Sequence, residues 1–90
     1  MNATTSWGQS IRVVGNHPAL GSWNPASGVT LSAATYPVWR AQVAIAAGTA
    51  VEYKYVRVDP DGRVTWESGG NRVVTVPTSG LLALSDTWRS

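Results

Sequence analysis

The chain has 90 residues, of which 43% are hydrophobic and only 13% are charged, so we expect one folded domain over residues 1–90. It has no cysteine, which excludes a disulfide framework and a cysteine zinc site. The net charge is +2, and the arginines are scattered among acidic residues, whereas nucleic-acid-binding surfaces usually cluster them. No apolar run approaches the length of a membrane span. The N-terminus lacks the basic and apolar regions of a signal peptide, so we expect any targeting segment to lie outside this sequence.

In chain order, the first half predicts short strands separated by loops. A strand at 11–14 ends at Gly15, and the composition of 15–28 (Pro, Gly, Asn and Ser) indicates a loop. Residues 29–31 predict a second strand and residues 32–37 another loop. Residues 38–45 alternate, with Trp39, Ala41, Val43 and Ile45 on one face and Arg40 and Gln42 on the other.

The segment 51–72 predicts a β-hairpin. Two runs rich in Val, Tyr and Trp flank Asp59, Pro60, Asp61 and Gly62, which favour a type I turn followed by a G1 bulge. If Asp59 faces Arg63 across this turn, Val58 faces Val64 and Val56 faces Trp66. Strands at 72–76 and from Leu81 to about Trp88 complete seven or eight strands. Such a pattern, with no sustained helical period, predicts an all-β sandwich or small barrel.

The hairpin register also predicts a ligand-binding group. Lys54 lies diagonally beside Trp66, and the carboxylate of Glu67 follows at the strand end. A flat apolar ring surrounded by hydrogen-bonding groups suits a sugar, whose C–H faces stack on the ring while its hydroxyls need polar partners.

The other aromatic residues divide between core and surface. Trp39, Tyr53 and Tyr55 occupy apolar strand faces and are expected in the core, with Trp88 capping one end of it. Trp23, and likewise Trp7 and Tyr36, lie in predicted loops, where no strand directs their side chains toward the core. Exposed aromatic residues on stiff loops indicate a binding surface.

The ordered motifs LGSW (20–23), EYKY (52–55), WES (66–68) with Asn71 and Arg72, and DTWR (86–89) resemble the starch-binding domains of carbohydrate-binding module family 20. The resemblance runs from about Ala3 to Arg89. It implies an antiparallel, immunoglobulin-like β-sandwich, attached to a secreted amylase-type enzyme, that binds α-1,4-glucans at two sites without catalysing a reaction. Its partners would be starch, maltooligosaccharides and cyclodextrins. A monomer with no cofactor, metal, nucleic acid or membrane partner is expected.

By position, the resemblance implies a first site with Trp23 and Trp66 as stacking platforms and with three hydrogen-bonding residues: Lys54, Glu67 and Asn71. It implies a second site on Trp7 and Tyr36. Ala34 and Thr35 stand where relatives often carry polar or charged contacts, so this second site is expected to be the weaker one.

Three alternatives remain open from the residues. The first alternative is an independent enzyme. Glycoside hydrolysis needs two carboxylates at a set separation, but Asp59 and Asp61 belong to a turn and Glu67 has no obvious partner carboxylate. His17 has no nucleophile arrangement to serve and cannot form a metal site alone. The second alternative is a barrel that binds single-stranded nucleic acid on aromatic platforms, and the third is a protein-interaction sandwich.

Overall fold

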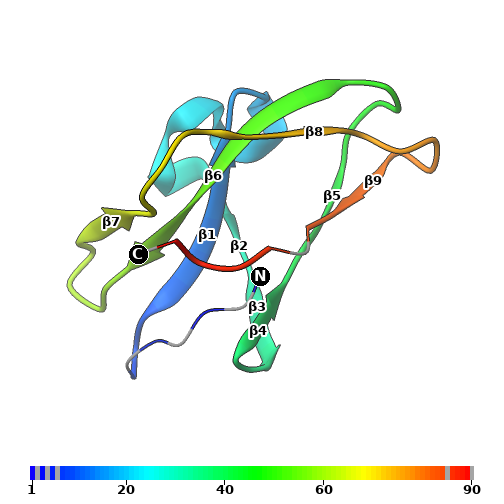
Figure 1. Cartoon of the computed structure of the whole chain (residues 1–90). Helices are drawn as coiled ribbons and strands as arrows, with labels where there is room; N and C mark the ends of the chain where they lie inside the picture. Colours follow the sequence, from blue (N-terminus) through cyan, green and yellow to red (C-terminus); the bar gives the residue numbers. More distant parts are fainter. Residues whose placement is uncertain (2, 4, 6, 85, 90) are drawn as a thin grey trace.

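The computed structural model describes residues 1, 3, 5, 7–84 and 86–89. Over these residues the chain forms nine strands, which are labelled in Figure 1, and two short 3-10 helices, η1 and η2. No helix in the described residues is long and apolar enough to cross a membrane. The elements in chain order are β1 (Ser10–Gly15), η1 (Pro18–Trp23), η2 (Pro25–Ser27), β2 (Val29–Thr30), β3 (Ser32–Thr35), β4 (Val38–Arg40), β5 (Gln42–Ala44), β6 (Ala50–Val58), β7 (Val64–Trp66), β8 (Arg72–Thr75) and β9 (Leu81–Ala83).

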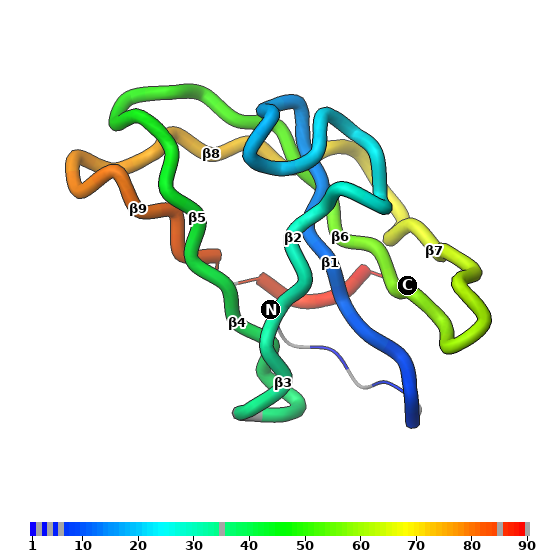
Figure 2. Tube along the Cα trace, turned by 180° about the vertical axis from the view of Figure 1, so that it is seen from behind, coloured from blue at the N-terminus to red at the C-terminus, as the bar shows by residue number. Residues whose placement is uncertain are grey.

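The strands pair into an antiparallel β-sandwich, which confirms the predicted fold class with nine strands in place of seven or eight. The larger sheet has the order β2-β1-β6-β7, and β8 pairs with β6 as well. Two-stranded ladders join β3 to β4 and β5 to β9. Figures 1 and 2 show β5 and β9 on the other side of the molecule from β1 and β6.

The core lies between these layers and follows the alternation of the strands. Val51, Tyr53 and Tyr55 of β6 are all buried, as predicted for this face. Trp39 is buried too, and Trp88 packs against the core. The remaining members of the buried cluster are Met1, Ala3, Ile11, Val13, Leu20, Leu31, Val43, Ile45, Val76 and Leu82.

The segment 32–45 differs from its prediction in two ways. Residues 32–35, predicted as a loop, form β3, which pairs antiparallel with β4. Residues 38–45, predicted as one strand, divide between β4 and β5 on either side of Ala41 because the two halves have different partners, β3 and β9. The predicted alternation itself is confirmed, since Trp39, Val43 and Ile45 are buried while Arg40 and Gln42 are exposed.

The N-terminal residues contribute more to the core than their polar neighbours indicate. Met1 and Ala3 are only 2% and 5% exposed. The Trp39 backbone N–H donates to the Met1 carbonyl oxygen at 2.6 Å, and the Trp39 Nε1–H donates to the Ala3 carbonyl oxygen at 3.0 Å. The N-terminal residues therefore continue the β4 edge, which composition alone does not reveal.

The predicted hairpin register is confirmed. Val56 faces Trp66 and Val58 faces Val64. The Asp59 N–H donates to the Arg63 carbonyl at 2.8 Å, and Gly62 has a φ of 89°, as the bulge after a type I turn requires. Trp66 therefore extends from the outer face of β7. It lies opposite Val56, which is two residues from Lys54 along β6.

β6 has two successive partners along one edge, β7 and then β8. If the register of β7 continued, Tyr53 would face Gly69, but it faces Arg72 instead. The chain between Trp66 and Arg72 is therefore three residues longer than a continuous ladder would need, and it bulges out of the sheet. This bulge, residues 67–71, contains two of the predicted site residues, Glu67 and Asn71.

Candidate functional site

Trp23 is held by a tightly constrained turn at the end of η1. The Leu20 N–H donates to the His17 carbonyl at 2.8 Å, and the Ala19 N–H donates to His17 Nδ1 at 3.0 Å, which caps the helix. Gly21 has a φ of 80°, and a Cβ there would lie 2.6 Å from the backbone of Ser27.

Ser22 and Trp23 also have positive φ values, 49° and 67°. This conformation costs a non-glycine residue about 1–2 kcal/mol, and such strain persists where the surrounding structure enforces it. The backbone of Trp23 is thus tightly constrained, in a segment that the sequence predicts only as a loop.

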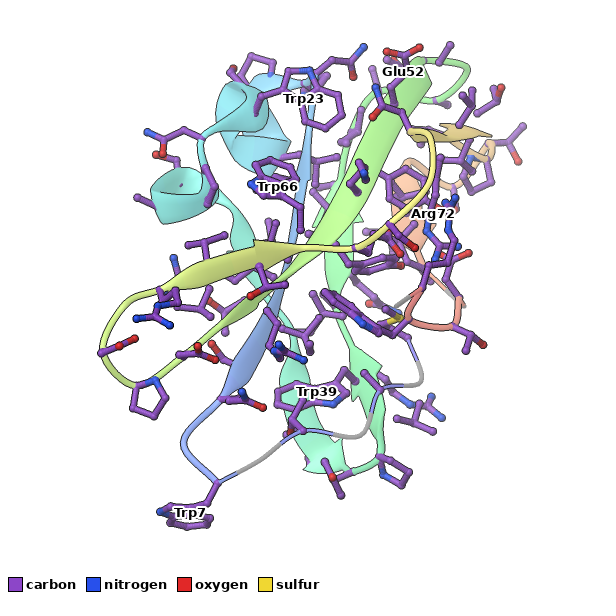
Figure 3. All side chains as sticks on the ribbon, turned by 60° about the vertical axis from the view of Figure 1, so that its left-hand side comes forward. Trp7, Trp23, Trp39, Glu52, Trp66 and Arg72 are labelled. Atoms are coloured by element: carbon purple, nitrogen blue, oxygen red, sulfur yellow. The ribbon has the colours of Figure 1, made fainter. Side chains whose placement is uncertain are left out.

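Trp23 and Trp66 form one aromatic surface. Their ring centroids are 6.5 Å apart and their planes are inclined by 42° (Figure 3). Trp66 is 42% exposed and Trp23 is partly exposed. Asn71 is exposed in the adjacent bulge, and Lys54 Nζ donates to the Gly69 carbonyl of the same bulge at 2.9 Å. Of the five residues predicted for the first site, Trp23 and Trp66 form this surface, Asn71 lies exposed in the bulge beside it, and Lys54 of β6 binds the bulge.

Glu67, the fifth residue, is placed differently from the other four. Its side chain is completely buried, and it is the only buried polar residue among those the structure describes. Its Oε2 accepts hydrogen bonds from the Tyr55 backbone N–H at 3.0 Å and from Arg72 Nε at 2.9 Å. Its Oε1 accepts one from Arg72 Nη2 at 2.7 Å and pairs with Arg89 Nε at 3.7 Å. A carboxylate with no exposed surface and both oxygens occupied cannot accept a hydrogen bond from a ligand.

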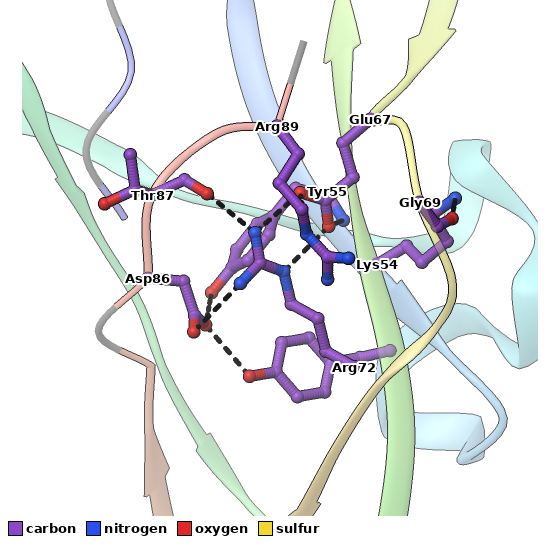
Figure 4. Close-up of polar contacts among 9 residues, drawn as sticks. Lys54, Tyr55, Glu67, Gly69, Arg72, Asp86, Thr87 and Arg89 are labelled. Atoms are coloured by element: carbon purple, nitrogen blue, oxygen red, sulfur yellow. Dashed lines mark hydrogen bonds and ion pairs between the residues drawn. The ribbon is translucent and has the colours of Figure 1, made fainter.

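Arg72 and Asp86 extend this polar network to the C-terminal segment (Figure 4). Asp86 Oδ2 accepts hydrogen bonds from the hydroxyls of Tyr53 at 2.9 Å and Tyr55 at 2.6 Å. Asp86 also pairs with Arg72 Nη1 at 3.2 Å, and Arg72 Nη2 donates to the Thr87 carbonyl at 2.6 Å. The C-terminal segment is thereby attached to β6 and β8.

The network shifts the pKa values of its members. Burial, with a smaller contribution from the hydrogen bonds to Asp86, raises the pKa of Tyr53 and of Tyr55 well above the ordinary value. The hydrogen bonds to Glu67 raise the pKa of Arg72 further. All three groups therefore keep their protons over the whole neutral range, and the network has a stabilising role.

A second aromatic surface lies toward the opposite end of the molecule, where Trp7 projects into solvent (Figure 3). Trp7 is 99% exposed and Tyr36 is 49% exposed. They line a cavity of about 390 Å³ together with Thr5, Gly8, Gln9, Ala33 and Trp39. The Tyr36 hydroxyl accepts a hydrogen bond from the Thr5 N–H at 3.1 Å and donates one to the Thr5 carbonyl at 3.2 Å, so its ring is fixed against the N-terminal segment.

Sequence reasoning missed the contribution of Trp39 to this cavity. Its ring packs edge-on against Tyr36, with centroids 6.2 Å apart and planes at 75°, and it supports the exposed ring from below. Alternation assigns Trp39 to the core, which is correct, but the short interval between Tyr36 and Trp39 is the available signal that they are in contact.

Comparison with known proteins gives consistent matches. A family model described as starch binding domain matches residues 1–85. An alpha-amylase from Streptomyces violaceus is 58% identical over 90 residues, which are 100% of this chain and 16% of that protein. A glycoside hydrolase family 15 glucoamylase from Hypocrea jecorina has a TM-score of 0.88 at 42% identity, over 98% of this chain and 16% of that chain.

An isolated module provides a comparison of similar size. The family 20 carbohydrate-binding module of a maltotetraose-forming amylase from Pseudomonas saccharophila has a TM-score of 0.74 at 38% identity, over 83% of this chain and 81% of that chain. The chain therefore spans a small part of the alpha-amylase and the glucoamylase, and most of a separately solved binding module.

Proposed function

The chain belongs to the family of starch-binding domains, and from this membership we propose that it binds α-1,4-glucans at two aromatic sites without catalysing their cleavage. The observation that carries the proposal is the pair of exposed indoles, Trp23 and Trp66, at 6.5 Å. Two tilted rings suit the curved outline of an α-glucan, because neighbouring glucose units do not lie in one plane.

At the first site, glucose rings would stack on Trp23 and Trp66 through their C–H faces. Lys54 and Asn71 border this surface and would supply hydrogen bonds to sugar hydroxyls. We exclude Glu67 from direct contact because its side chain is buried. The second site would use Trp7 and Tyr36 over their shared cavity.

The partners and the setting follow from the same comparisons. Starch, maltooligosaccharides and cyclodextrins are the proposed ligands, since each presents α-1,4-linked glucose. Because the chain covers only 16% of an alpha-amylase and of a glucoamylase, we propose that residues 1–90 are one domain, monomeric in itself and attached to a catalytic domain. Its parent enzyme is proposed to be extracellular, where polymeric starch is accessible.

Titration with maltoheptaose, followed by tryptophan fluorescence, tests this function. Binding should depend only weakly on salt, because neutral sugars release no counterions. A single-stranded nucleic acid would instead give a slope of about −0.7 per phosphate contact. A hundredfold loss of affinity over a tenfold rise in ionic strength would contradict the proposal and favour an anionic ligand. The protein should also release no reducing sugar from soluble starch.

Replacing Trp7 with Ala should clearly lower retention on starch granules while barely changing the affinity of the first site for maltoheptaose. Two sites that engage neighbouring glucan chains reinforce each other through effective concentration, which a short soluble ligand cannot exploit. Trp7 is far from Trp66 and almost completely exposed, so its removal should leave the fold intact (Figure 3). Paired binding curves on granules and on maltoheptaose measure both effects. Unchanged granule binding would show that the second site is vestigial.

A further inference from the structure

We propose that Glu67 and Arg89 are positioning residues that hold the Trp66 platform and the adjoining bulge, residues 67–71, in the conformation that binds glucan. The inference rests on the function proposed above and concerns residues behind the binding surface. Glu67 contacts no ligand in this arrangement. It acts through the backbone of Tyr55 and through the two arginines that it binds.

The interruption of the β6 ladder explains why a carboxylate is needed at this position. The Glu67 N–H still donates to the Tyr55 carbonyl at 3.1 Å, but the chain then bulges out. The Tyr55 N–H would be left without a carbonyl partner, and Glu67 Oε2 accepts it at 3.0 Å. A buried N–H without a partner costs about 1–3 kcal/mol, so this one side chain fixes where β7 ends. Trp66 is the last residue of β7 and is therefore positioned by the same contact.

Arg89 holds the bulge from the side of the C-terminal segment. The Ser68 N–H donates to the Arg89 carbonyl at 2.9 Å. The Arg89 guanidinium lies against Gly69, where a Cβ would be 2.7 Å from Nη1. On the other side of the bulge, Lys54 Nζ binds the Gly69 carbonyl. Gly69 is thus enclosed between Arg89 and Lys54 and has a φ of 85°, which a side chain rarely adopts.

These contacts form a continuous chain of interactions from Glu67 to the sugar-facing residues (Figure 4). Glu67 pairs with Arg89, Arg89 supports Gly69, and Gly69 restrains the ammonium of Lys54. The C-terminal segment is also linked to Glu67 through Arg72, which binds Asp86 and the Thr87 carbonyl as well as Glu67. The binding surface and its support therefore come from three parts of the chain that are distant in sequence: η1, the segment 51–72 and the segment 86–89.

A double-mutant cycle with maltoheptaose tests the inference. Glu67→Gln and Arg89→Gln should each weaken binding by about tenfold, and the double variant should also be about tenfold weaker and not about a hundredfold, because both changes break the same chain of contacts. Near-ultraviolet circular dichroism without ligand should change in both single variants, since it reports the orientation of the Trp23 and Trp66 rings. All titrations are made at a temperature where every variant is fully folded.

Other outcomes of the cycle would overturn the inference. Weaker binding by Glu67→Gln with normal binding by Arg89→Gln would show that Arg89 is not a positioning residue, because Glu67 would then act through Tyr55 and Arg72 alone. Multiplied effects in the double variant would mean that the two residues act separately. A wild type that does not bind maltoheptaose would refute the proposed function and the inference together, whereas a binding wild type with an uncoupled cycle would refute the inference alone.

Two glycines provide a second test if Glu67→Gln does not fold. Gly69→Ala would place a methyl group against Arg89 and should weaken maltoheptaose binding by about tenfold. Gly70→Ala is the matched control, because a Cβ at Gly70 meets nothing within 4 Å and its φ is not in the left-handed region. It should bind within about twofold of the wild type. Equal affinities for the two variants would overturn the inference.

Discussion

Replacing Trp66 with Ala is expected to weaken maltoheptaose binding by about 2 kcal/mol or more, which corresponds to about thirtyfold in affinity. The indole is 42% exposed and forms one surface with Trp23, which is the proposed first site. Its removal takes away the ring on which a glucose unit would stack, and Trp23 alone cannot match two successive units. Isothermal titration calorimetry measures the loss without depending on the fluorescence of the deleted residue.

Trp7→Ala is the matched control for Trp66→Ala. It removes the same side chain from the other aromatic surface, and Trp7 is even more exposed than Trp66. Its affinity for maltoheptaose should remain close to that of the wild type. If Trp66→Ala bound maltoheptaose as tightly as Trp7→Ala, the assignment of the first site would be wrong.

The hairpin around Gly62 is the part of the fold that local sequence predicts best. Pro60 and Gly62 each restrict the backbone in a way that fits only a few turn types, and strict alternation then fixes the register. The structure confirms the pairing of Val56 with Trp66. Every determinant of that pairing lies within a few residues of the turn, so no distant contact was needed.

The role of Glu67 could not be predicted in the same way. Alternation puts Trp66 outward and Glu67 inward, but burial of a carboxylate normally requires paired charges. Those charges come from Arg72, after the bulge of residues 67–71, and from Arg89 near the C-terminus. The bulge and the return of residues 86–89 across the sheet depend on tertiary contacts, which the sequence around Glu67 does not predict.

The residues of the first site differ in how far the sequence itself indicates them. The hairpin register predicts that Lys54 and Trp66 lie together, whereas only the family resemblance assigns Trp23 and Asn71 to this site. The left-handed conformation of Trp23 depends on the close approach of Gly21 to Ser27, which no sequence pattern announces. Similarly, residues 32–35 carry no strong strand signal, because β3 has small side chains and its pairing with β4 is short.

Alkaline pH is expected to destabilise the domain steeply, starting at about pH 10, where unfolded tyrosines begin to lose their protons. Tyr53 and Tyr55 are 5% and 0% exposed, and burial beside Asp86 raises the pKa of each in the folded state. Above about pH 10 the unfolded chain therefore binds fewer protons than the folded one, so the free energy of unfolding falls as pH rises.

The magnitude follows from the number of protons involved. Each tyrosine that stays protonated only in the folded state lowers the free energy of unfolding by about 1.4 kcal/mol per pH unit. Two such residues give about 2.8 kcal/mol per pH unit, a large fraction of the roughly 5–15 kcal/mol that stabilises a typical domain. The contribution is fully present below about pH 10 and is lost as pH rises toward the folded-state pKa values.

Urea unfolding at several pH values between about 8 and 11.5 measures this slope. Tyr53→Phe and Tyr55→Phe keep the rings but remove the hydroxyls that bind Asp86, so each should reduce the slope by about half, and the double variant should nearly abolish it. Each variant also leaves Asp86 with one acceptor site unfilled, which lowers stability at neutral pH as well. The diagnostic quantity is therefore the change of stability with pH and not its absolute value. A double variant as sensitive to alkali as the wild type would mean that the buried tyrosines do not control alkaline unfolding.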